Sequence, residues 1–376
     1  MAGIAVEQGG RTQTRRGHTD GGSGFAAIDL GTNNCRLLVG IPTHGAEFRV
    51  VDSFSRAVRL GEGLHAHGRL GSPAMDRTLM ALAAISARLE RRPVRIVRAV
   101  ATEACRQATN GREFLARALE ETGLRFDLIS TREEAELTLE SCAPLLQGGG
   151  RRALLFDIGG GSTELAWIRL GSGAPELIGY DSLPVGVVTL AERYGRDSGT
   201  AAGFQAMVDD IKVRLASFER IHCIAHEVRD GGVRLLGTSG TVTTLAGIVL
   251  KLDRYRRPLV DGAVLSTRDA ADAVSLLRRL GPAGLAAHPC VGPDRLEFVL
   301  PGCAVFEAIR QTWPMAEVTV ADRGLREGML LRMMRQSRTP ASRPAPTRPA
   351  LTSSGLAQTP LAMRGQRAMV RPPQPV

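Results

Sequence analysis

The hydrophobic positions of the chain alternate between short apolar runs typical of β-strands and longer stretches with helical periodicity. The first half predicts strands at 25–30, 35–41, 48–54, 94–100 and 126–129, and helices at 72–91 and 112–122. A second unit begins at residue 152 and predicts strands at 153–158, 164–170, 177–182 and 233–236, and helices at 203–218 and 267–280. Each half therefore predicts a mixed sheet with helices packed on it, in an α/β fold.

The length of 376 residues is too great for one ordinary core and predicts two domains. A hydrophobic fraction of 43% and a charged fraction of 23% exclude a wholly disordered chain, a collagen and a coiled coil. The sequence has no apolar stretch of about 18 residues and no apolar signal-peptide core, so we expect a cytoplasmic protein without a membrane partner. Its six cysteines form no CxxC pair, which indicates reduced thiols, four of them in apolar runs.

The formal net charge of +10 is concentrated near the chain ends. Residues 337–376 contain six arginines and no acidic residue, and residues 1–24 contain three arginines against two acids, which leaves +3 for the body. Aromatic residues make up 4%, so stacking surfaces are scarce and no nucleic-acid partner is expected. The segments 1–23 and 337–376 have the composition of disordered extensions.

An internal repeat links the two halves. The stretch 25–39 can be laid over 154–168 with Asp29 on Asp157 and Gly31 on Gly159, and both stretches predict strand, polar turn, strand. One Asp-x-Gly turn is often an ordinary hairpin, but two such turns, each near the start of one half, predict two related domains. Each domain would then present one loop to a shared cleft.

The glycine-rich turn of residues 159–163 can bind an anion. Because Gly159, Gly160 and Gly161 have no β-carbon, successive N–H groups can converge on phosphate oxygens, and the Ser162 hydroxyl adds a donor. Asp157, at the strand end, is placed to hold a divalent cation beside that phosphate. A flexible hairpin turn is the alternative. The lysine-bearing P-loop and the GxGxxG pattern are both absent.

Glu133 and Glu134 stand at the start of a predicted helix that bridges the halves and extends to about residue 142. At a helix N-terminus a carboxylate is expected to keep a normal or lowered pKa, which suits it to accept a proton or to orient a water. A capping box with Ser130 or Thr131 is the alternative. One glutamate at most can serve that box, which leaves the other for the cleft.

Three further sites have weaker patterns. Arg106 follows a strand and could bind phosphate, although a solvated surface arginine is the plain alternative. The turn of Thr238, Ser239 and Gly240 lies between a strand and a helix start, which is an anion site by geometry. His222 and His226 have the spacing of a zinc pair if helical, but no clear fourth ligand accompanies them, so surface histidines are favoured.

These motifs together resemble the exopolyphosphatase and guanosine pentaphosphate phosphohydrolase family, in its short two-domain form. The resembling segments cover residues 24–335 in family order: AAIDLGTNNCRLLV, SRAVRLGEGLHAHGRL, ATEACRQATN, ISTREEAEL, LLFDIGGGSTELAWI, LGTSGTVTTLAGI, DRLEFVLPGCAVFEAI and ADRGLREGML.

The resemblance implies two ribonuclease-H-like, actin-like domains of the sugar kinase and heat-shock ATPase superfamily with an interdomain cleft. Domain I would span 24–130, domain II would span 131–321 with the linking helix, and a helix at about 322–336 would return to domain I. The resemblance further implies Mg²⁺, with Asp157 at the metal and Glu134 and Glu164 as catalytic residues, Glu134 being the base. The implied substrate-binding residues are Asp29, Gly31, Thr32, Asn33, Arg106, Gly159, Gly160, Gly161, Ser162, Thr238, Ser239 and Gly240.

The leading functional hypothesis is a magnesium-dependent exopolyphosphatase that releases terminal orthophosphate from inorganic polyphosphate. It is favoured over guanosine pentaphosphate phosphohydrolysis because the glycine-rich turns contain no aromatic residue to stack on a base. A kinase and an actin-like nucleotide-binding module on the same fold are the remaining alternatives. The oligomeric state stays open, with a homodimer as the candidate.

Overall fold

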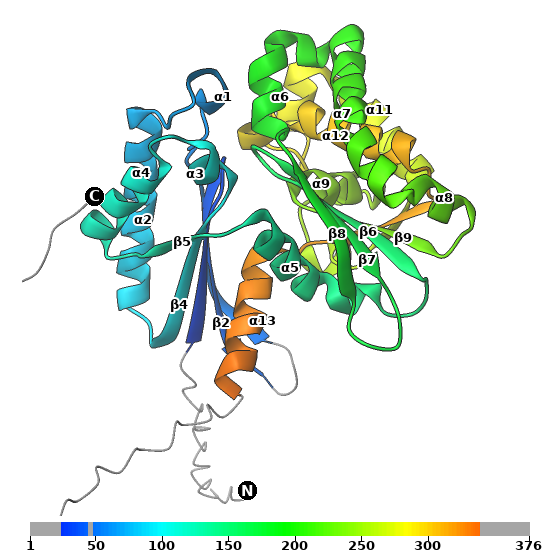
Figure 1. Cartoon of the computed structure of the whole chain (residues 1–376). Coiled ribbons are helices and arrows are strands. Elements are labelled where there is room, and N and C mark those ends of the chain that lie inside the picture. The colour runs from blue at the N-terminus through cyan, green and yellow to red at the C-terminus, as the bar shows by residue number, and fades with distance from the viewer. Residues whose placement is uncertain (1–23, 44–47, 339–376) are drawn as a thin grey trace, which may run out of the picture. The chain divides into compact units, whose positions relative to one another are not determined.

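The computed structural model describes residues 24–43 and 48–338, which form two mixed β-sheets with helices on both faces of each (Figure 1). The expectations for residues 1–23 and for 339–376 lie outside the described residues. The last helix extends to Arg338, two residues into the segment that composition assigned to the terminal extension.

The N-terminal sheet has five strands in the order β3-β2-β1-β4-β5. β2 pairs antiparallel with β1 and β3, whereas β4 runs parallel to β1 and to β5. The strand bounds are β1 Gly24–Leu30, β2 Asn34–Pro42, β3 Phe48–Ala57, β4 Val94–Ala101 and β5 Phe126–Leu128.

The C-terminal sheet repeats this arrangement and adds one antiparallel edge strand, in the order β10-β11-β9-β6-β7-β8. β7 pairs antiparallel with β6 and β8, and β9 runs parallel to β6 and to β11. The bounds are β6 Arg152–Ile158, β7 Thr163–Arg169, β8 Glu176–Leu183, β9 Val233–Thr238, β10 Val264–Ser266 and β11 Glu317–Ala321. The internal repeat in the sequence is thus a repeat of topology.

Helices cover the N-terminal sheet on two faces (Figure 1). α2 and α4 pack on one face in a core cluster that includes Leu82 and Phe114, and α13 packs on the other face through Met329 and Leu330. The helices of this half are α1 Leu64–His67, α2 Ser72–Glu90, α3 Glu103–Gln107 and α4 Gly111–Thr122, together with α13 Leu325–Arg338, the last helix of the described residues.

The C-terminal sheet is covered by α5 on one face and by the larger group of helices on the other. Their bounds are α5 Thr131–Cys142, α6 Val187–Tyr194, α7 Ala201–His222, α8 Ile224–Arg229, α9 Gly240–Val249, α10 Arg257–Val260, α11 Thr267–Ala287 and α12 Val299–Thr312. Three 3₁₀ turns, at Ala143–Leu146, Gly195–Gly199 and Pro293–Arg295, join them. No helix within the described ranges has the length and apolar character needed to cross a membrane.

The hydrophobic pattern located the long strands but missed two central elements, α12 and β11. α12 is buried almost all round, from Val299 to Ile309, so it has no polar face and no amphipathic period. β11 is a five-residue strand whose last four residues are buried, and such a short apolar run cannot be distinguished from a buried helix by periodicity.

Leu330 of α13 provides a test of the packing on the N-terminal sheet. Its side chain has 0% exposure, and truncation would leave a cavity between α13 and the sheet. Leu330→Ala is expected to lower the free energy of unfolding by about 2–5 kcal/mol in urea denaturation. The matched control Leu259→Ala, at 49% exposure, should change it by less than about 0.5 kcal/mol. Similar losses in the two variants would contradict this packing.

Candidate active site

The two Asp-x-Gly turns lie at corresponding ends of the two sheets and contact each other. Asp29 pairs across strands with Arg36, and Asp157 pairs with Glu164 at the equivalent register. A β-carbon built on Gly161 would lie 2.6 Å from Thr32 Oγ1. The absence of a side chain at Gly161 therefore permits the two loops to meet.

The backbone of each loop is turned so that some of its N–H groups remain free. The carbonyls of Gly159 and Gly160 accept hydrogen bonds from Val187 N–H (3.0 Å) and Val188 N–H (2.8 Å) at the start of α6. Within the described parts of the chain, no hydrogen bond uses the N–H groups of Gly160 and Gly161. These two donors are available to an anion, as the sequence predicts for this turn.

The facing loop is fixed in the same way. Gly31 N–H donates to Asn34 O (3.0 Å), and Asn33 O accepts from Val58 N–H (2.8 Å) and Arg59 N–H (2.9 Å). Asn33 Oδ1 is buried and has no partner among the residues described. A buried amide oxygen of this kind can accept a hydrogen bond from an ordered water or bind a cation.

Glu164 is held by two hydroxyl groups. Ser162 Oγ donates to Glu164 Oε1 over a short distance, and Ser182 Oγ donates to the same oxygen at 3.0 Å. Ser162 and Glu164 are both buried. The Ser162 hydroxyl is thus engaged by the carboxylate, and its contact with phosphate stays a prediction.

The two glutamates at the start of α5 take different partners. Ser130 caps the helix by accepting Glu133 N–H at 3.2 Å, and the Glu133 carboxylate forms an ion pair with Arg98. Glu134 Oε2 accepts from Arg106 Nη1 at 2.8 Å. Glu134 therefore takes no part in the helix cap. The sequence spacing predicts that at most one of the two glutamates serves the cap, and the structure agrees.

Arg106 is placed to position Glu134. Its guanidinium also donates to Glu103 Oε2 (2.9 Å and 3.2 Å) and to Ile129 O (3.0 Å). With these contacts, most of its donors are used within the protein. The sequence expectation of Arg106 on the phosphate chain stays a prediction, and the contacts in the structure are those of a side chain that orients Glu134.

The expectation of a normal or lowered pKa for Glu134 is wrong. Burial, with the nearby charge of Glu164, raises the pKa of Glu134 to about 8 despite the ion pair with Arg106. Burial likewise raises the pKa of Asp157 to about 7, that of Glu164 to about 7, and that of Asp29 above its usual range. Four carboxyl groups meet in one desolvated centre, and this raises the pKa of Glu134 by more than the helix N-terminus lowers it.

This donor set fits Mg²⁺ when the ion is shared with a phosphate ligand. No group of three or more His, Cys, Asp or Glu side chains is arranged to hold a metal in the described residues, so a closed protein cage is not present there. Mg²⁺ is commonly held by one or two carboxylates together with waters and substrate phosphates. Asp157 and Asp29, which are close enough for the charge of Asp29 to raise the pKa of Asp157, match that pattern.

The loop of Thr238, Ser239 and Gly240 adds a hydrogen-bond donor on a strained backbone. Ser239 has φ 90° and ψ 175° immediately before α9, a conformation that non-glycine residues rarely adopt, and its hydroxyl is buried without a partner in the described chain. Thr238 Oγ1 is engaged with Arg323 O at 2.7 Å, and Gly240 O accepts from Arg295 at 3.5 Å. Of the two hydroxyl groups in this loop, that of Ser239 is therefore the one without a partner among the described residues.

A cavity of about 750 Å³ is lined by neighbours of the two loops, although by no residue of the loops themselves, and the sequence analysis missed it. Arg59 and Val188 line this cavity, and their backbone N–H groups bond to Asn33 O and to Gly160 O in the two loops. The apolar part of its lining includes Leu296 and Phe298. Because the lining residues come from segments far apart in the sequence, no local pattern identifies the cavity.

His222 and His226 do not lie on one helix. His222 ends α7, Cys223 has φ 50° and breaks the helix, and His226 lies in α8, where it contacts Asp230 at 3.2 Å. The helical i, i+4 spacing that a zinc pair would need is therefore not present at these two histidines. Four of the six cysteines are buried in the core, as their apolar surroundings predict.

Comparison with known proteins identifies the family. The sequence profile of the Ppx/GppA phosphatase family matches residues 41–337. The chain belongs to this family. It is 33% identical over 307 residues to the guanosine-5'-triphosphate,3'-diphosphate pyrophosphatase of Aeromonas salmonicida (strain A449), covering 81% of this chain. It spans 58% of the length of that relative.

Solved structures confirm the predicted fold class of two actin-like α/β domains. The Ppx/GppA family member of Aquifex aeolicus has a TM-score of 0.70 at 26% identity, over 84% of this chain and 99% of that chain. An exopolyphosphatase-like protein has a TM-score of 0.74 at 27% identity, over 84% and 98% of the two chains. The predicted family resemblance is confirmed as well.

Proposed function

We propose that this protein removes the terminal phosphate of guanosine pentaphosphate by Mg²⁺-dependent attack of water. The observation behind the proposal is the cavity of about 750 Å³ whose lining residues Arg59 and Val188 hydrogen-bond to the two loops. Phosphates bound at the loops would leave the nucleoside of the same molecule beside the apolar lining of that cavity. The name of the Aeromonas salmonicida relative supports the same substrate.

In the proposed reaction the loops hold the scissile phosphate through the N–H groups of Gly160 and Gly161. Glu134, oriented by Arg106, accepts a proton from the attacking water, and the leaving phosphate chain departs in line. When bound, Mg²⁺ supplies the positive charge that neutralises phosphate oxygens and lowers the pKa of the neighbouring carboxyls. The Ser239 hydroxyl, which has no partner within the described chain, is available to a further phosphate oxygen.

Inorganic polyphosphate is the second candidate substrate. Its terminal phosphate would use the same loops and the same base, and it needs no base-binding pocket. The exopolyphosphatase-like structural relative supports this reading. A kinase would require a hydroxyl acceptor in place of water, so release of free phosphate from either substrate separates hydrolysis from phosphoryl transfer.

Phe298 provides the test that separates the two substrates. Its ring lines the cavity beneath the Arg59 guanidinium, whose Cζ lies 5.7 Å from the ring centre. Phe298→Ala is expected to raise KM for guanosine pentaphosphate by about 10-fold or more, because an apolar and stacking contact with the base is lost. Rates of phosphate release from polyphosphate should change by less than about 3-fold.

The control for that variant is Ile221→Ala, an apolar truncation at a position of 68% exposure outside the cavity, which should leave both KM values unchanged. Equal increases in KM for both substrates in Phe298→Ala would contradict a nucleoside in the cavity. Higher kcat/KM for polyphosphate than for guanosine pentaphosphate in the unaltered protein would return the assignment to the second candidate.

A further inference from the structure

Glu103 is a largely buried carboxylate near the proposed base, and it has no part in the reaction proposed above. It is the first residue of α3, which follows β4. Its side chain is 14% exposed, and the side chains of Arg106 and Glu134 are 16% and 15% exposed. Three charged side chains thus meet where little solvent reaches them, and their pairing decides how the guanidinium of Arg106 is oriented.

The hydrogen bonds of the Arg106 guanidinium divide between its two sides. On one side, Nε and Nη2 both donate to Glu103 Oε2, at 3.2 Å and 2.9 Å. On the other side, Nη1 donates to Glu134 Oε2 at 2.8 Å and to Ile129 O at 3.0 Å. Because the guanidinium is planar and rigid, fixing the side at Glu103 also fixes the direction of the side at Glu134.

Glu103 is itself held in place. Its second carboxylate oxygen, Oε1, accepts a short hydrogen bond from Gln107 Nε2 at the end of α3. α3 is packed closely into the N-terminal half, since Cys105 is 2% exposed and a β-carbon built on Gly111 would lie 2.2 Å from Cys105 O. The carboxylate therefore lies on a well-packed element, which suits it to orient a second side chain.

The bond between Glu103 and Arg106 is not an ordinary surface ion pair. Exposed pairs of this kind contribute little, because solvent screens them. Burial acts to lower the pKa of Arg106, but the contacts with Glu134 and Glu103 raise it above its usual range. The guanidinium therefore keeps its charge, and its hydrogen bonds to the two carboxylates are charge-assisted.

Arg106 lies close to the proposed phosphate site. Burial raises the pKa of Glu164, which stands next to the glycine-rich turn, and the charge of Arg106 acts against that increase. Without Glu103, one side of the guanidinium would be left unpaired in a region with little solvent, which is costly. The freed side would then bind another anion, and the proposed reaction supplies phosphate oxygens nearby.

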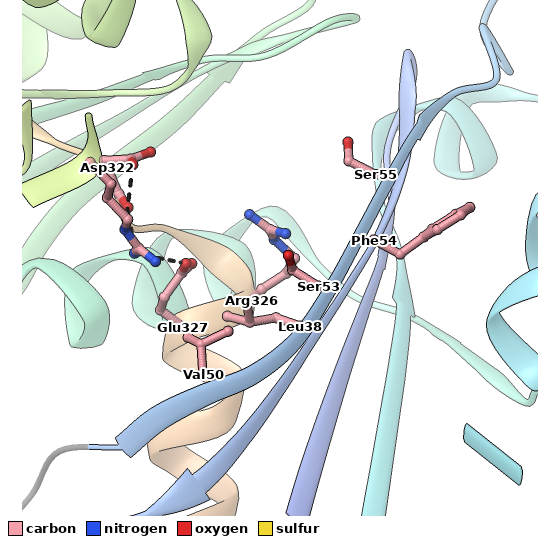
Figure 2. Close-up of a pocket in the computed structure, with 9 residues that line it drawn as sticks. Leu38, Val50, Ser53, Phe54, Ser55, Asp322, Arg326 and Glu327 are labelled. Atoms are coloured by element: carbon pink, nitrogen blue, oxygen red, sulfur yellow. Dashed lines mark hydrogen bonds and ion pairs between the residues drawn. The ribbon is translucent and has the colours of Figure 1, made fainter. Parts of the chain in front are cut away.

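A second buried arginine of the centre is not fixed in this way. Arg326 lines a pocket of about 210 Å³ and interacts electrostatically with Asp29. Figure 2 shows its guanidinium beside Ser53, and no hydrogen bond or ion pair joins it to the other residues of that pocket. Burial lowers the pKa of Arg326, whereas that of Arg106 is raised. The fixed orientation of Arg106 is therefore a consequence of its own partners.

We propose that Glu103 is a positioning residue, which holds one side of the Arg106 guanidinium, directs the other side to Glu134 and keeps Arg106 from the substrate phosphates. The inference rests on the proposed function for the role of Glu134 as base. Within the described chain no hydrogen bond joins Glu103 to Glu134, so the effect passes through Arg106. The family resemblance implies Arg106 on the phosphate chain, and Glu103 is the side chain that decides between the two positions.

The first test compares kcat with KM in phosphate release under saturating Mg²⁺. Glu103→Ala is expected to lower kcat by about 10-fold or more, because Glu134 loses its fixed orientation. KM should stay the same or fall, because the released Arg106 can bind phosphate. Glu103→Gln keeps a hydrogen-bond acceptor at the same place and should lose less, and it serves as the test if the alanine variant does not fold.

The matched control is Glu113→Gln, which alters an exposed acid in the first turn of the neighbouring helix α4 and should change neither parameter. A kcat of Glu103→Ala within about 2-fold of the unaltered protein would overturn the proposal. A rise in KM together with the loss in kcat would also overturn it, because disruption of the site, and not release of Arg106, produces that pattern.

A double variant shows whether Glu103 acts through Arg106. In an Arg106→Met background the guanidinium is absent, so adding Glu103→Ala should change kcat by less than about 2-fold. The two substitutions are then strongly non-additive, as expected for residues that act in one chain of contacts. Equal losses of kcat from Glu103→Ala with and without Arg106 would overturn the proposal.

A binding measurement tests the same link without turnover. In EDTA, isothermal titration calorimetry with tripolyphosphate should show Glu103→Ala binding about 3-fold or more tighter than the unaltered protein, with no gain in the double variant. Unchanged or weaker binding would overturn the proposal. A protein that shows this gain but hydrolyses neither candidate substrate would refute the proposed function and leave the control of Arg106 by Glu103 intact. Normal kcat of Glu103→Ala on guanosine pentaphosphate would have the reverse meaning.

Discussion

Glu134→Gln is expected to lower kcat by about 10² or more while KM for the substrate changes by less than about 3-fold. The amide keeps the size of the side chain and can accept one hydrogen bond from Arg106, which donates to Glu134 at 2.8 Å. It cannot accept the proton of the attacking water. The measurement is phosphate release under saturating substrate and Mg²⁺, with a binding assay to show that the site is intact.

Glu133→Gln is the matched control, because it makes the same chemical change one residue away. The Glu133 carboxylate forms an ion pair with Arg98 and not with Arg106. Its loss should therefore reduce kcat by less than about 3-fold. Near-normal turnover of a folded Glu134→Gln protein, or equal losses in the two variants, would remove Glu134 from the role of base.

The position of Glu134 could be predicted from sequence, but its electrostatics could not. The segment around Ser130 predicts a helix start with one glutamate in the cap and one free, and Ser130 does cap Glu133 N–H. The pKa of Glu134 is raised by its burial and then by the charge of Glu164, which lies on β7, a strand separated from α5 in sequence. Such a contact leaves no trace in local spacing, so the prediction of a normal or lowered pKa failed.

The repeat of the two Asp-x-Gly turns predicts the shared topology of the two sheets. Positions at which the two repeats carry different residues indicate where the halves differ in function. Arg36 and Glu164 occupy equivalent positions, each paired with the aspartate at the end of the first strand of its sheet. The second half therefore places an acid beside the aspartate proposed to bind the metal, where the first half places a cation. This charge asymmetry is visible in the sequence once the repeat is aligned.

The residues on which we base the proposed preference for guanosine pentaphosphate are separated in sequence. The glycine-rich turns contain no aromatic residue, which favoured polyphosphate. Phe298 and Leu296 line the same cavity as Val188, and the cavity forms only when these distant segments have folded together. The sequence of the turns alone therefore could not predict the side of the cavity that Leu296 and Phe298 form.

Asp157→Asn is expected to have two opposite effects, a loss of activity by about 10² or more and a gain in stability. Activity should fall because an amide oxygen is a poorer ligand for Mg²⁺ than a carboxylate, and the dependence on Mg²⁺ should weaken with it. Stability should rise because the buried centre is crowded with acids. Burial raises the pKa of Asp157 from 3.8 to about 7, with Glu134 contributing next.

The direction in which the stability of the protein changes with pH follows from proton binding by Asp157. A carboxyl whose pKa is raised in the folded state binds its proton more tightly when folded, so its stabilising contribution is complete below the ordinary pKa of 3.8. That contribution is lost as the pH rises through about 7, where Asp157 must ionise inside the folded protein. The amide of the Asp157→Asn variant cannot ionise, so the stability of the variant should fall less between pH 5 and pH 8, a range of roughly 3 pH units.

The measurement is thermal unfolding in EDTA at pH 5 and at pH 8. At the higher pH, Asp157→Asn should unfold about 2–6 °C above the unaltered protein, and at the lower pH the difference between the two midpoints should be smaller. The control Asp127→Asn changes an exposed aspartate of β5 and should move neither midpoint. A lower unfolding midpoint for Asp157→Asn at pH 8 would mean that the Asp157 carboxylate stabilises the metal-free fold. Repulsion among the buried acids would then not destabilise the metal-free protein, and Mg²⁺ would have no such repulsion to relieve.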